Sequence, residues 1–169
     1  GRVYIYGKEA DKLTDRENAA GIGYVSQDPD NQIVTDKVWH ELAFGLENLG
    51  MDNVTIRKKV AEMSEYFGIT GWYDREVSKL SGGQKQILNL ASVMVMQPGI
   101  LLLDEPTANL DPLAAIRFLD VVKRINQELG VTVVMVEHNL EHIYADADRI
   151  IAIDKGRVAA NSSPKKAAA

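Results

Sequence analysis

The segment that decides the fold of this chain reads Ile100-Leu101-Leu102-Leu103-Asp104-Glu105-Pro106. An apolar run that ends in adjacent carboxylates is typical of a buried parallel strand that carries acidic groups to its C-terminal end. Ligands of open α/β sheets bind at that edge. Asp104 can serve Mg²⁺ there, because this hard ion prefers oxygen ligands and keeps much of its water. Glu105 can orient a water for attack on a phosphate. A core strand with a chance acidic end would read the same in isolation.

Further motifs lie on both sides of this strand. Upstream are Tyr24-Val25-Ser26-Gln27-Asp28-Pro29-Asp30-Asn31-Gln32 and then Leu80-Ser81-Gly82-Gly83-Gln84-Lys85-Gln86. Downstream are Ala108-Asn109-Leu110-Asp111 and then His138, just past the apolar run 131–136. From near Gly1 to about Ala160, this order and spacing resembles the ATP-binding cassette (ABC) ATPases. In that family these segments are the Q-loop, the LSGGQ signature, the D-loop and the switch histidine, and ILLLDEP is the Walker B strand.

The alternation of apolar strands and amphipathic helices predicts an α/β fold with a mainly parallel sheet, and the resemblance implies a P-loop NTPase-like fold. We expect further strands over 2–6, 21–26, 131–136 and 149–153. We expect helices over 41–49, 53–67 and 81–96, and one that begins at Asp111. Asn53 is the expected N-cap of the helix over 53–67, and Gly68 its stop.

Apolar residues recur at helical spacing in two of these helices. They are Ile56, Val60, Met63 and Phe67 in the first, and Phe118, Val122, Ile125 and Leu129 in the second. The mostly helical stretch 32–96 should form a helical subdomain that carries the signature, with Gln27 at its hinge. Residues 1–31 and 97–160 should form a RecA-like α/β core portion, and 161–169 a flexible tail.

The resemblance implies roles for the residues at the strand ends. Glu105 corresponds to the catalytic carboxylate, which acts as general base or holds the attacking water. Asp104 corresponds to the carboxylate that serves Mg²⁺. Gln27 corresponds to the Q-loop glutamine near the metal and the water. His138 corresponds to the switch histidine, which would contact the γ-phosphate of ATP and support Glu105.

The signature segment begins a helix, where exposed amides and the helix dipole favour an anion. The resemblance implies that Ser81, Gly82, Gly83 and Gln84 cap the γ-phosphate bound by a second cassette, so the site is complete only in a homo- or heterodimer. Asp111 would contact that second cassette through the D-loop. Beside Pro112 it also fits a helix N-cap, and both roles can hold together.

A G-x-x-x-x-G-K-[S/T] loop, the Walker A element whose amides and lysine hold nucleotide phosphates, does not occur in this sequence. Gly7-Lys8-Glu9 is the nearest segment, and it lacks the glycine spacing and the hydroxyl residue. The resemblance therefore implies a cassette without its front end. We expect the 169-residue chain by itself to bind MgATP weakly and to be inactive as an ATP hydrolase.

Composition places modest bounds on function. The net charge of −5 argues against broad nucleic-acid binding, and zero cysteines exclude disulfides and thiolate metal sites. No apolar run approaches the roughly 20 residues of a membrane span.

The segment PDNQ, with Ala43-Phe44-Gly45-Leu46-Glu47-Asn48-Leu49-Gly50, resembles the ATPase subunits of energy-coupling factor importers. Those subunits drive uptake of vitamins and transition-metal ions by a transmembrane partner, from the cytoplasmic face of the membrane.

Two other classes of function stay open. One is an ABC ATPase that works in DNA repair or on ribosomes, which the acidic charge and the PDNQ segment disfavour. The other is a catalytically silent interaction module, which the absent Walker A loop favours for the chain alone.

A partner surface is expected beside the Q-loop. A groove near Gln27, Pro29, Asn31, Gln32 and the helix around Phe44 should receive a short helix of the transmembrane subunit. The apolar residues Ile33, Val34, Val38, Trp39, Leu42 and Phe44 lie close together in sequence, and an exposed apolar patch is a docking site for a helix. Alternatively, all of them pack inside the helical insert.

Overall fold

The computed structural model describes residues 1–138, 143–144 and 146–163, and the chain divides into two compact units, Gly1–Val136 and Glu137–Ala169. The helices of the first unit are α1 (Asp15–Gly21), α2 (Val38–Asn48), α3 (Asn53–Tyr66), α4 (Gly82–Met94) and α5 (Pro112–Leu129). Its strands are β1 (Tyr4–Ile5), β2 (Lys8–Glu9), β3 (Ile22–Val25), β4 (Ile100–Asp104) and β5 (Thr132–Val136). Short 3₁₀ helices span Ala10–Lys12, Pro29–Asn31, Thr70–Trp72 and Val77–Lys79. The second unit contains the antiparallel hairpin of β6 (Ile150–Asp154) and β7 (Arg157–Ser162).

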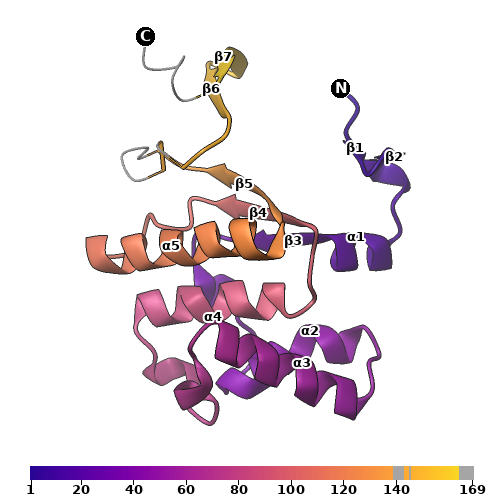
Figure 1. Cartoon of the computed structure of the whole chain (residues 1–169), viewed down its shortest axis with the longest axis vertical. Helices are drawn as coiled ribbons and strands as arrows, with labels where there is room; N and C mark the ends of the chain where they lie inside the picture. Colours follow the sequence, from indigo (N-terminus) through magenta and orange to yellow (C-terminus); the bar gives the residue numbers. More distant parts are fainter. Residues whose placement is uncertain (139–142, 145, 164–169) are drawn as a thin grey trace. The chain divides into compact units, whose positions relative to one another are not determined.

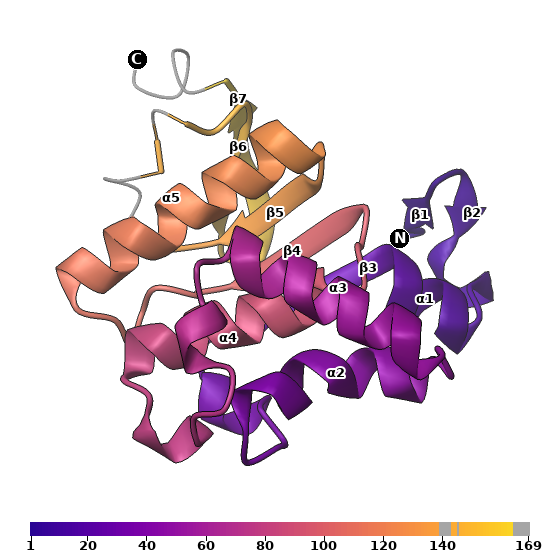
Figure 2. The same cartoon turned by 60° about the horizontal axis from the view of Figure 1, so that its bottom comes forward.

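The first unit is layered around a parallel sheet in the order β3-β4-β5, so the motif strand β4 is central. Helices α4 and α5 lie against one face of the sheet, and α2 and α3 form a further layer on α4 (Figures 1 and 2). Val25, Leu101 and Leu103 point into this covered side and are at most 1% exposed. Residues of the opposite face, Tyr24 and Val134, are about half exposed at 48% and 51%. The predicted α/β fold is thus confirmed, with the core on one side of the sheet.

The predicted buried faces of the two helices are confirmed except at Leu129, and the predicted N-cap of α3 is wrong. Ile56, Val60, Met63 and Phe67 are all buried, and so are Phe118, Val122 and Ile125. Leu129 is 45% exposed, because α5 ends there and Gly130 turns the chain in the left-handed region at φ 67°. The N-cap of α3 is Asp52 rather than Asn53, since the Asp52 carboxylate accepts the backbone N–H groups of Val54 and Thr55.

The ends of the chain depart from the predicted strands. The segment predicted as one strand over 2–6 is a hairpin of β1 and β2, which turns at Tyr6 and Gly7 with φ of 51° and 79°. Helix α1 was not predicted, although Thr14 and Glu17 form a capping box at its start. Strand β7 continues to Ser162, two residues into the segment that was expected to be a tail from residue 161. The predicted division into residues 1–31 with 97–160, and 32–96, stays a prediction.

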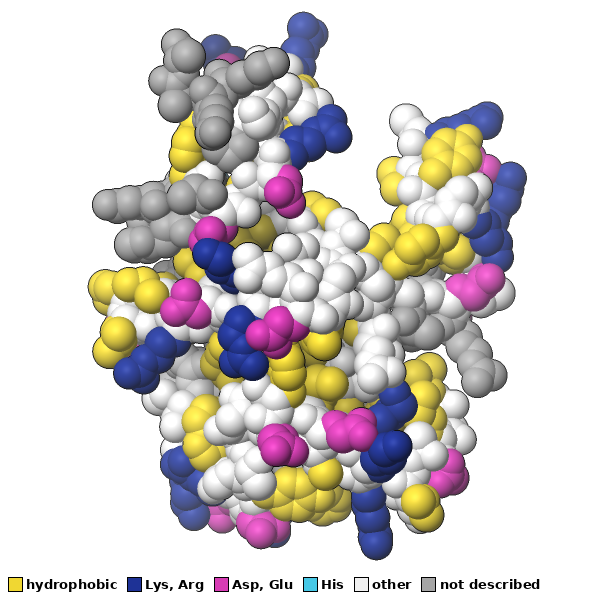
Figure 3. All heavy atoms as spheres, in the orientation of Figure 1, with side chains coloured by type: hydrophobic (Ala, Val, Ile, Leu, Met, Phe, Trp, Pro, Cys, Tyr) yellow, Lys and Arg dark blue, Asp and Glu magenta, His cyan; other side chains and the backbone are white. Residues whose placement is uncertain are grey.

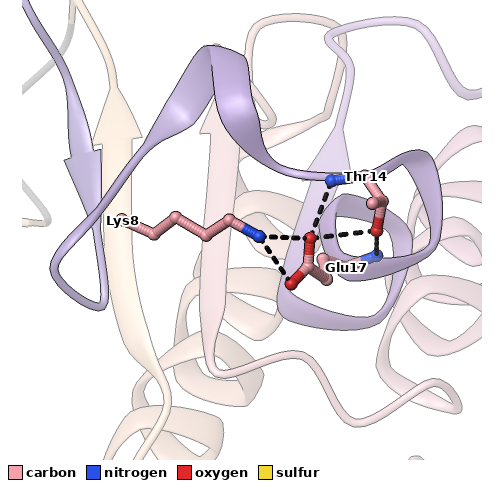
Figure 4. Close-up of polar contacts among 3 residues, drawn as sticks. All are labelled: Lys8, Thr14 and Glu17. Atoms are coloured by element: carbon pink, nitrogen blue, oxygen red, sulfur yellow. Dashed lines mark hydrogen bonds and ion pairs between the residues drawn. The ribbon is translucent and has the colours of Figure 1, made fainter.

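Lys8 and α1 are joined by the polar cluster of Figure 4. The Lys8 ammonium donates to both Glu17 carboxylate oxygens at 2.8 Å, and Glu17 also accepts the Thr14 N–H at 2.8 Å. The hydrogen bond from Lys8, followed by those from Thr14, lowers the pKa of Glu17 to about 2. Figure 3 shows that acidic and basic side chains are interspersed over the face in view.

The depressed pKa of Glu17 gives a pH prediction. A carboxyl whose pKa is lower in the folded chain than in the unfolded chain stabilises the fold above the unfolded pKa, and this contribution is lost as the pH falls toward the folded value. We expect the Glu17 carboxyl carbon signal in NMR to titrate near pH 2, and Lys8→Met to move that midpoint upward. Lys58→Met, which removes an exposed lysine of α3, is the control and should leave it in place. A Glu17 midpoint of ordinary value in the parent would contradict the cluster.

Candidate functional site

The register of the parallel sheet brings two predicted site residues together. Val25 of β3 pairs with Leu103 of β4, so both strands end at the same edge. Gln27 follows β3 and Glu105 follows β4, and the Gln27 Nε2 donates to Glu105 Oε2 at 3.4 Å. The edge that holds this pair is the edge where α/β sheets bind their ligands.

The backbone at Glu105 is held in an uncommon conformation. Its φ of 46° lies in the left-handed region, which costs a non-glycine residue about 1–3 kcal/mol, and residues held in this way cluster at functional sites. The N–H of Glu105 donates to the Val136 carbonyl at 2.9 Å, and its own carbonyl accepts the Ala108 N–H at 3.1 Å. The first bond ties the turn after β4 to the end of β5, and the second closes the turn itself.

Asp104 is exposed at the end of β4, and the sequence reading missed its neighbour. The Tyr24 hydroxyl donates to Asp104 Oδ2 at 3.2 Å. Desolvation, and then this hydrogen bond and the Asp104 charge, raise the pKa of Tyr24. No local sequence pattern indicated this contact, because it depends on the parallel register that sets Tyr24 opposite Leu102.

The donor set at this edge fits Mg²⁺. The ion binds through one or two carboxylates together with waters and substrate phosphates, rather than in an all-protein cage. Asp104 offers an exposed carboxylate, and the amide oxygen of Gln27 is a further oxygen donor. In the described part of the chain, no group of at least three His, Cys, Asp or Glu residues is arranged to hold a metal, which this mode of binding does not need.

The signature segment begins α4 as predicted. Ser81 is the N-cap, its hydroxyl accepts the Gln84 N–H at 3.3 Å, and Gln84 Oε1 accepts the Ser81 N–H at 3.0 Å. A Cβ on Gly82 would meet nothing within 4 Å, whereas one on Gly83 would lie 2.9 Å from the Ala114 Cβ. The space beside Gly82 is thus open, and Gly83 is small because the start of α5 packs against it.

Asp111 caps α5, as expected from its place before Pro112. Its carboxylate accepts the N–H groups of Leu113 and Ala114 at 3.1 and 3.0 Å. A contact of Asp111 with a second cassette stays a prediction.

His138 belongs to the second unit, and its predicted position beside Glu105 also stays a prediction. Of the other histidines, His40 lies 3.8 Å from Glu47 on α2, and His142 lies outside the described residues.

A buried polar group on α4 was missed by sequence reasoning. Gln86 and Asn89 are fully buried. Gln86 Nε2 donates to the carbonyls of Ser26 and Pro106, and Asn89 Nδ2 donates to Gln32 Oε1 at 3.1 Å. The signal available was a pair of amide residues three positions apart within an otherwise apolar helix face.

Comparison with known proteins agrees with this architecture. The ABC transporter family model matches residues 1–108. An ABC transporter ATP-binding protein of Bacillus cereus is 48% identical over 98% of this chain, which spans 30% of that protein. The energy-coupling factor transporter ATP-binding protein EcfA1 of Caldanaerobacter subterraneus is 40% identical over 98% of this chain, which spans 60% of its length.

Solved structures show the same fold. The structure of cbiO1 from Clostridium perfringens, described as part of the ABC transporter complex cbiONQ, superposes with a TM-score of 0.91 at 32% identity. It covers 99% of this chain, which spans 67% of cbiO1. The dimeric ATP-binding cassette MJ0796 in a post-hydrolysis state bound to ADP and Pi gives a TM-score of 0.81 at 25% identity, with coverage of 97% and 73%.

The sheet and its covering helices have the fold of the ABC ATPases, and the chain belongs to the ABC transporter family. Within the described residues, no helix is both long enough and apolar enough to span a bilayer.

Proposed function

We propose that this chain is part of the ATP-binding and ATP-hydrolysing subunit of an ABC importer that takes up a vitamin or a metal ion. The proposal that the subunit hydrolyses ATP is carried by the hydrogen bond between Gln27 and Glu105 at the C-terminal edge of the sheet. The names of the relatives EcfA1 and cbiO1 support the importer half.

The roles proposed for the site residues rest on their match to the ABC ATPase motifs and agree with their chemistry. Glu105 holds the attacking water and accepts its proton, and Gln27 fixes the Glu105 carboxylate and lies close to the water. Asp104 and Gln27 would hold Mg²⁺, which neutralises phosphate charge when bound. His138 contacts the γ-phosphate.

A second cassette would complete the site. Ser81, Gly82, Gly83 and Gln84 would face the γ-phosphate held by that cassette, where the start of α4 favours negative charge. Asp111 would contact the same cassette. The dimeric state named for the MJ0796 structure supports this arrangement. We also propose that the 169-residue chain alone does not turn over ATP, because it carries no G-x-x-x-x-G-K-[S/T] segment.

The membrane partner is proposed to dock beside the Q-loop, on the cytoplasmic face of the membrane. A groove of about 510 Å³ lies next to the predicted surface, and none of Gln27, Pro29, Asn31, Gln32 and Phe44 lines it. Its lining residues are Asp30, Ile33, Thr35, Asp36, Lys37, Glu76, Val77, Ser78 and Lys85. The expected apolar patch is smaller than predicted, since Val38 and Leu42 are fully buried in the core, whereas Val34 and Phe44 are 63% and 39% exposed. Five of the residues that line the groove are charged, which suits a helix with polar flanks. They are Asp30, Asp36, Lys37, Glu76 and Lys85.

This docking is tested with Phe44→Asp in an intact cassette that carries the present sequence. We expect loss of co-purification with the membrane subunits and an unchanged melting temperature, because an exposed aromatic contributes to binding rather than to the core. Val54→Asp is the matched control, since Val54 is 78% exposed on α3 rather than on α2. Unimpaired co-purification of Phe44→Asp would count against the docking surface. An ATPase that never co-purifies with membrane subunits would point to the non-transport alternative.

A further inference from the structure

We propose that Gln86 is a positioning residue that holds Gln27 opposite Glu105, and this inference rests on the proposed function. Gln86 Nε2 donates to the Ser26 carbonyl at 3.1 Å and to the Pro106 carbonyl at 3.0 Å. Ser26 precedes Gln27, and Pro106 follows Glu105. One side-chain amide therefore uses both of its hydrogens to tie together the two backbone segments whose side chains meet in the site.

The segment before Gln27 is clamped from two sides. The Ser26 N–H donates to Gln32 Oε1 at 2.9 Å, and Gln32 Nε2 donates to the Tyr24 carbonyl at 2.7 Å. Asn89 of α4 donates to the same Gln32 oxygen. Both backbone polar groups of Ser26 are thus fixed by amide side chains, those of Gln32 and Gln86. Gln86 comes from α4, and Gln32 is held by Asn89 of the same helix.

The burial of Gln86 is better explained by this role than by stability. Its side chain is 0% exposed, and its Oε1 finds no hydrogen-bond partner among the described residues. A buried acceptor without a partner costs stability and calls for an explanation. The reversed amide would place Oε1 against two carbonyl oxygens, so the network itself assigns the orientation. Gln86 Oε1 stays unpaired within the described part of the chain, while both Nε2 hydrogens donate to the backbone carbonyls next to Gln27 and Glu105.

Gln86 also connects two composite sites of the proposed dimer, because the signature at the start of α4 would face the nucleotide of the second cassette, whereas the Gln27–Glu105 pair would act on the nucleotide at its own sheet edge. Gln86 lies on α4 just after the signature residue Gln84, so a movement of the start of α4 reaches the Gln27–Glu105 pair through its amide. Glu105 depends on such support, because its left-handed backbone is strained and kept in place by its surroundings.

The test is Gln86→Met in an intact cassette, because methionine keeps the length and apolar contacts but has no donors. We expect kcat for ATP hydrolysis to fall about 10- to 100-fold, because a misplacement of about 1 Å can cost about 100-fold. The KM for ATP should change by less than about threefold, since Gln86 acts on the reacting geometry. A drop in kcat no larger than the drop in folded fraction would overturn the proposal.

A double-substitution cycle separates positioning from simple structural support. If Gln86 acts through the Gln27–Glu105 pair, Gln86→Met should add little to the loss in kcat caused by Gln27→Ala. Effects that multiply would refute the proposal. Asn126→Leu is the matched control, because Asn126 Nδ2 also donates to a carbonyl, that of Val131 at 2.9 Å, but at the end of α5. It should lower the melting temperature and leave kcat at the parent value.

Failure of this inference differs from failure of the proposed function. Turnover that survives Glu105→Gln would reject the catalytic site as a whole, whereas loss of turnover in that variant with parent kcat in Gln86→Met would reject only the positioning role. If Gln86→Met does not fold, hydrogen exchange in the parent decides the point. Both side-chain amide protons of Gln86 should exchange slowly, and rapid exchange would refute the bonds on which the inference rests.

Discussion

Replacing Glu105 by glutamine in an intact cassette that carries this sequence should reduce ATP turnover by at least about 100-fold, because general-base catalysis contributes that much or more. The amide keeps the size of the carboxylate and loses the ability to accept a proton. ATP binding and nucleotide-dependent dimer formation should persist, since Glu105 is proposed to act on the water rather than to hold the phosphates. Phosphate release, calorimetry with MgATP and size-exclusion chromatography measure the three properties.

The matched control for this substitution is Glu65→Gln, which makes the same change at an exposed carboxylate of α3. It should leave turnover, binding and dimer formation at parent values. If Glu105→Gln hydrolysed ATP near the parent rate, another group would have to activate the water, and the contact between Gln27 and Glu105 would lose its catalytic meaning.

The largest expected effect on stability comes from Phe118→Ala. Phe118 is 0% exposed on the face of α5 that enters the core. Removing a buried phenylalanine ring costs about 3–5 kcal/mol through lost transfer free energy and the cavity left behind. Domains of this size are stable by only about 5–15 kcal/mol, so we expect a melting temperature lower by roughly 10 °C. Urea unfolding followed by circular dichroism gives the free-energy difference directly.

Leu113→Ala is the control on the same helix, because Leu113 is 58% exposed. Its effect should lie within about 0.5 kcal/mol of zero, as for most surface substitutions. Equal losses in the two variants would mean that the buried stripe of α5 does not carry the packing between this helix and the sheet.

Local features of this protein could be predicted from the sequence because they depend on neighbouring residues. The apolar run before Asp104 forms a buried strand, and Ser81 and Asp111 cap their helices, since a capping oxygen reaches only N–H groups two or three residues away. The same local chemistry explains the error at α3, where Asp52 and Asn53 are adjacent capping residues and only the helix geometry selects between them. The capping box of Thr14 and Glu17 was likewise visible and was overlooked.

What only the tertiary structure decided are contacts between distant segments. Gln27 and Glu105 are 78 positions apart, and they meet because β3 and β4 pair in a register that the core side of the sheet imposes. A strand shifted by one residue would turn its buried side chains outward, so packing selects the register and no local pattern states it. In the sequence alone, Gln86 is not distinguished from the other polar residues around the signature. Its two bonds to the strand ends exist only because α4 lies against the sheet and β3 and β4 end together.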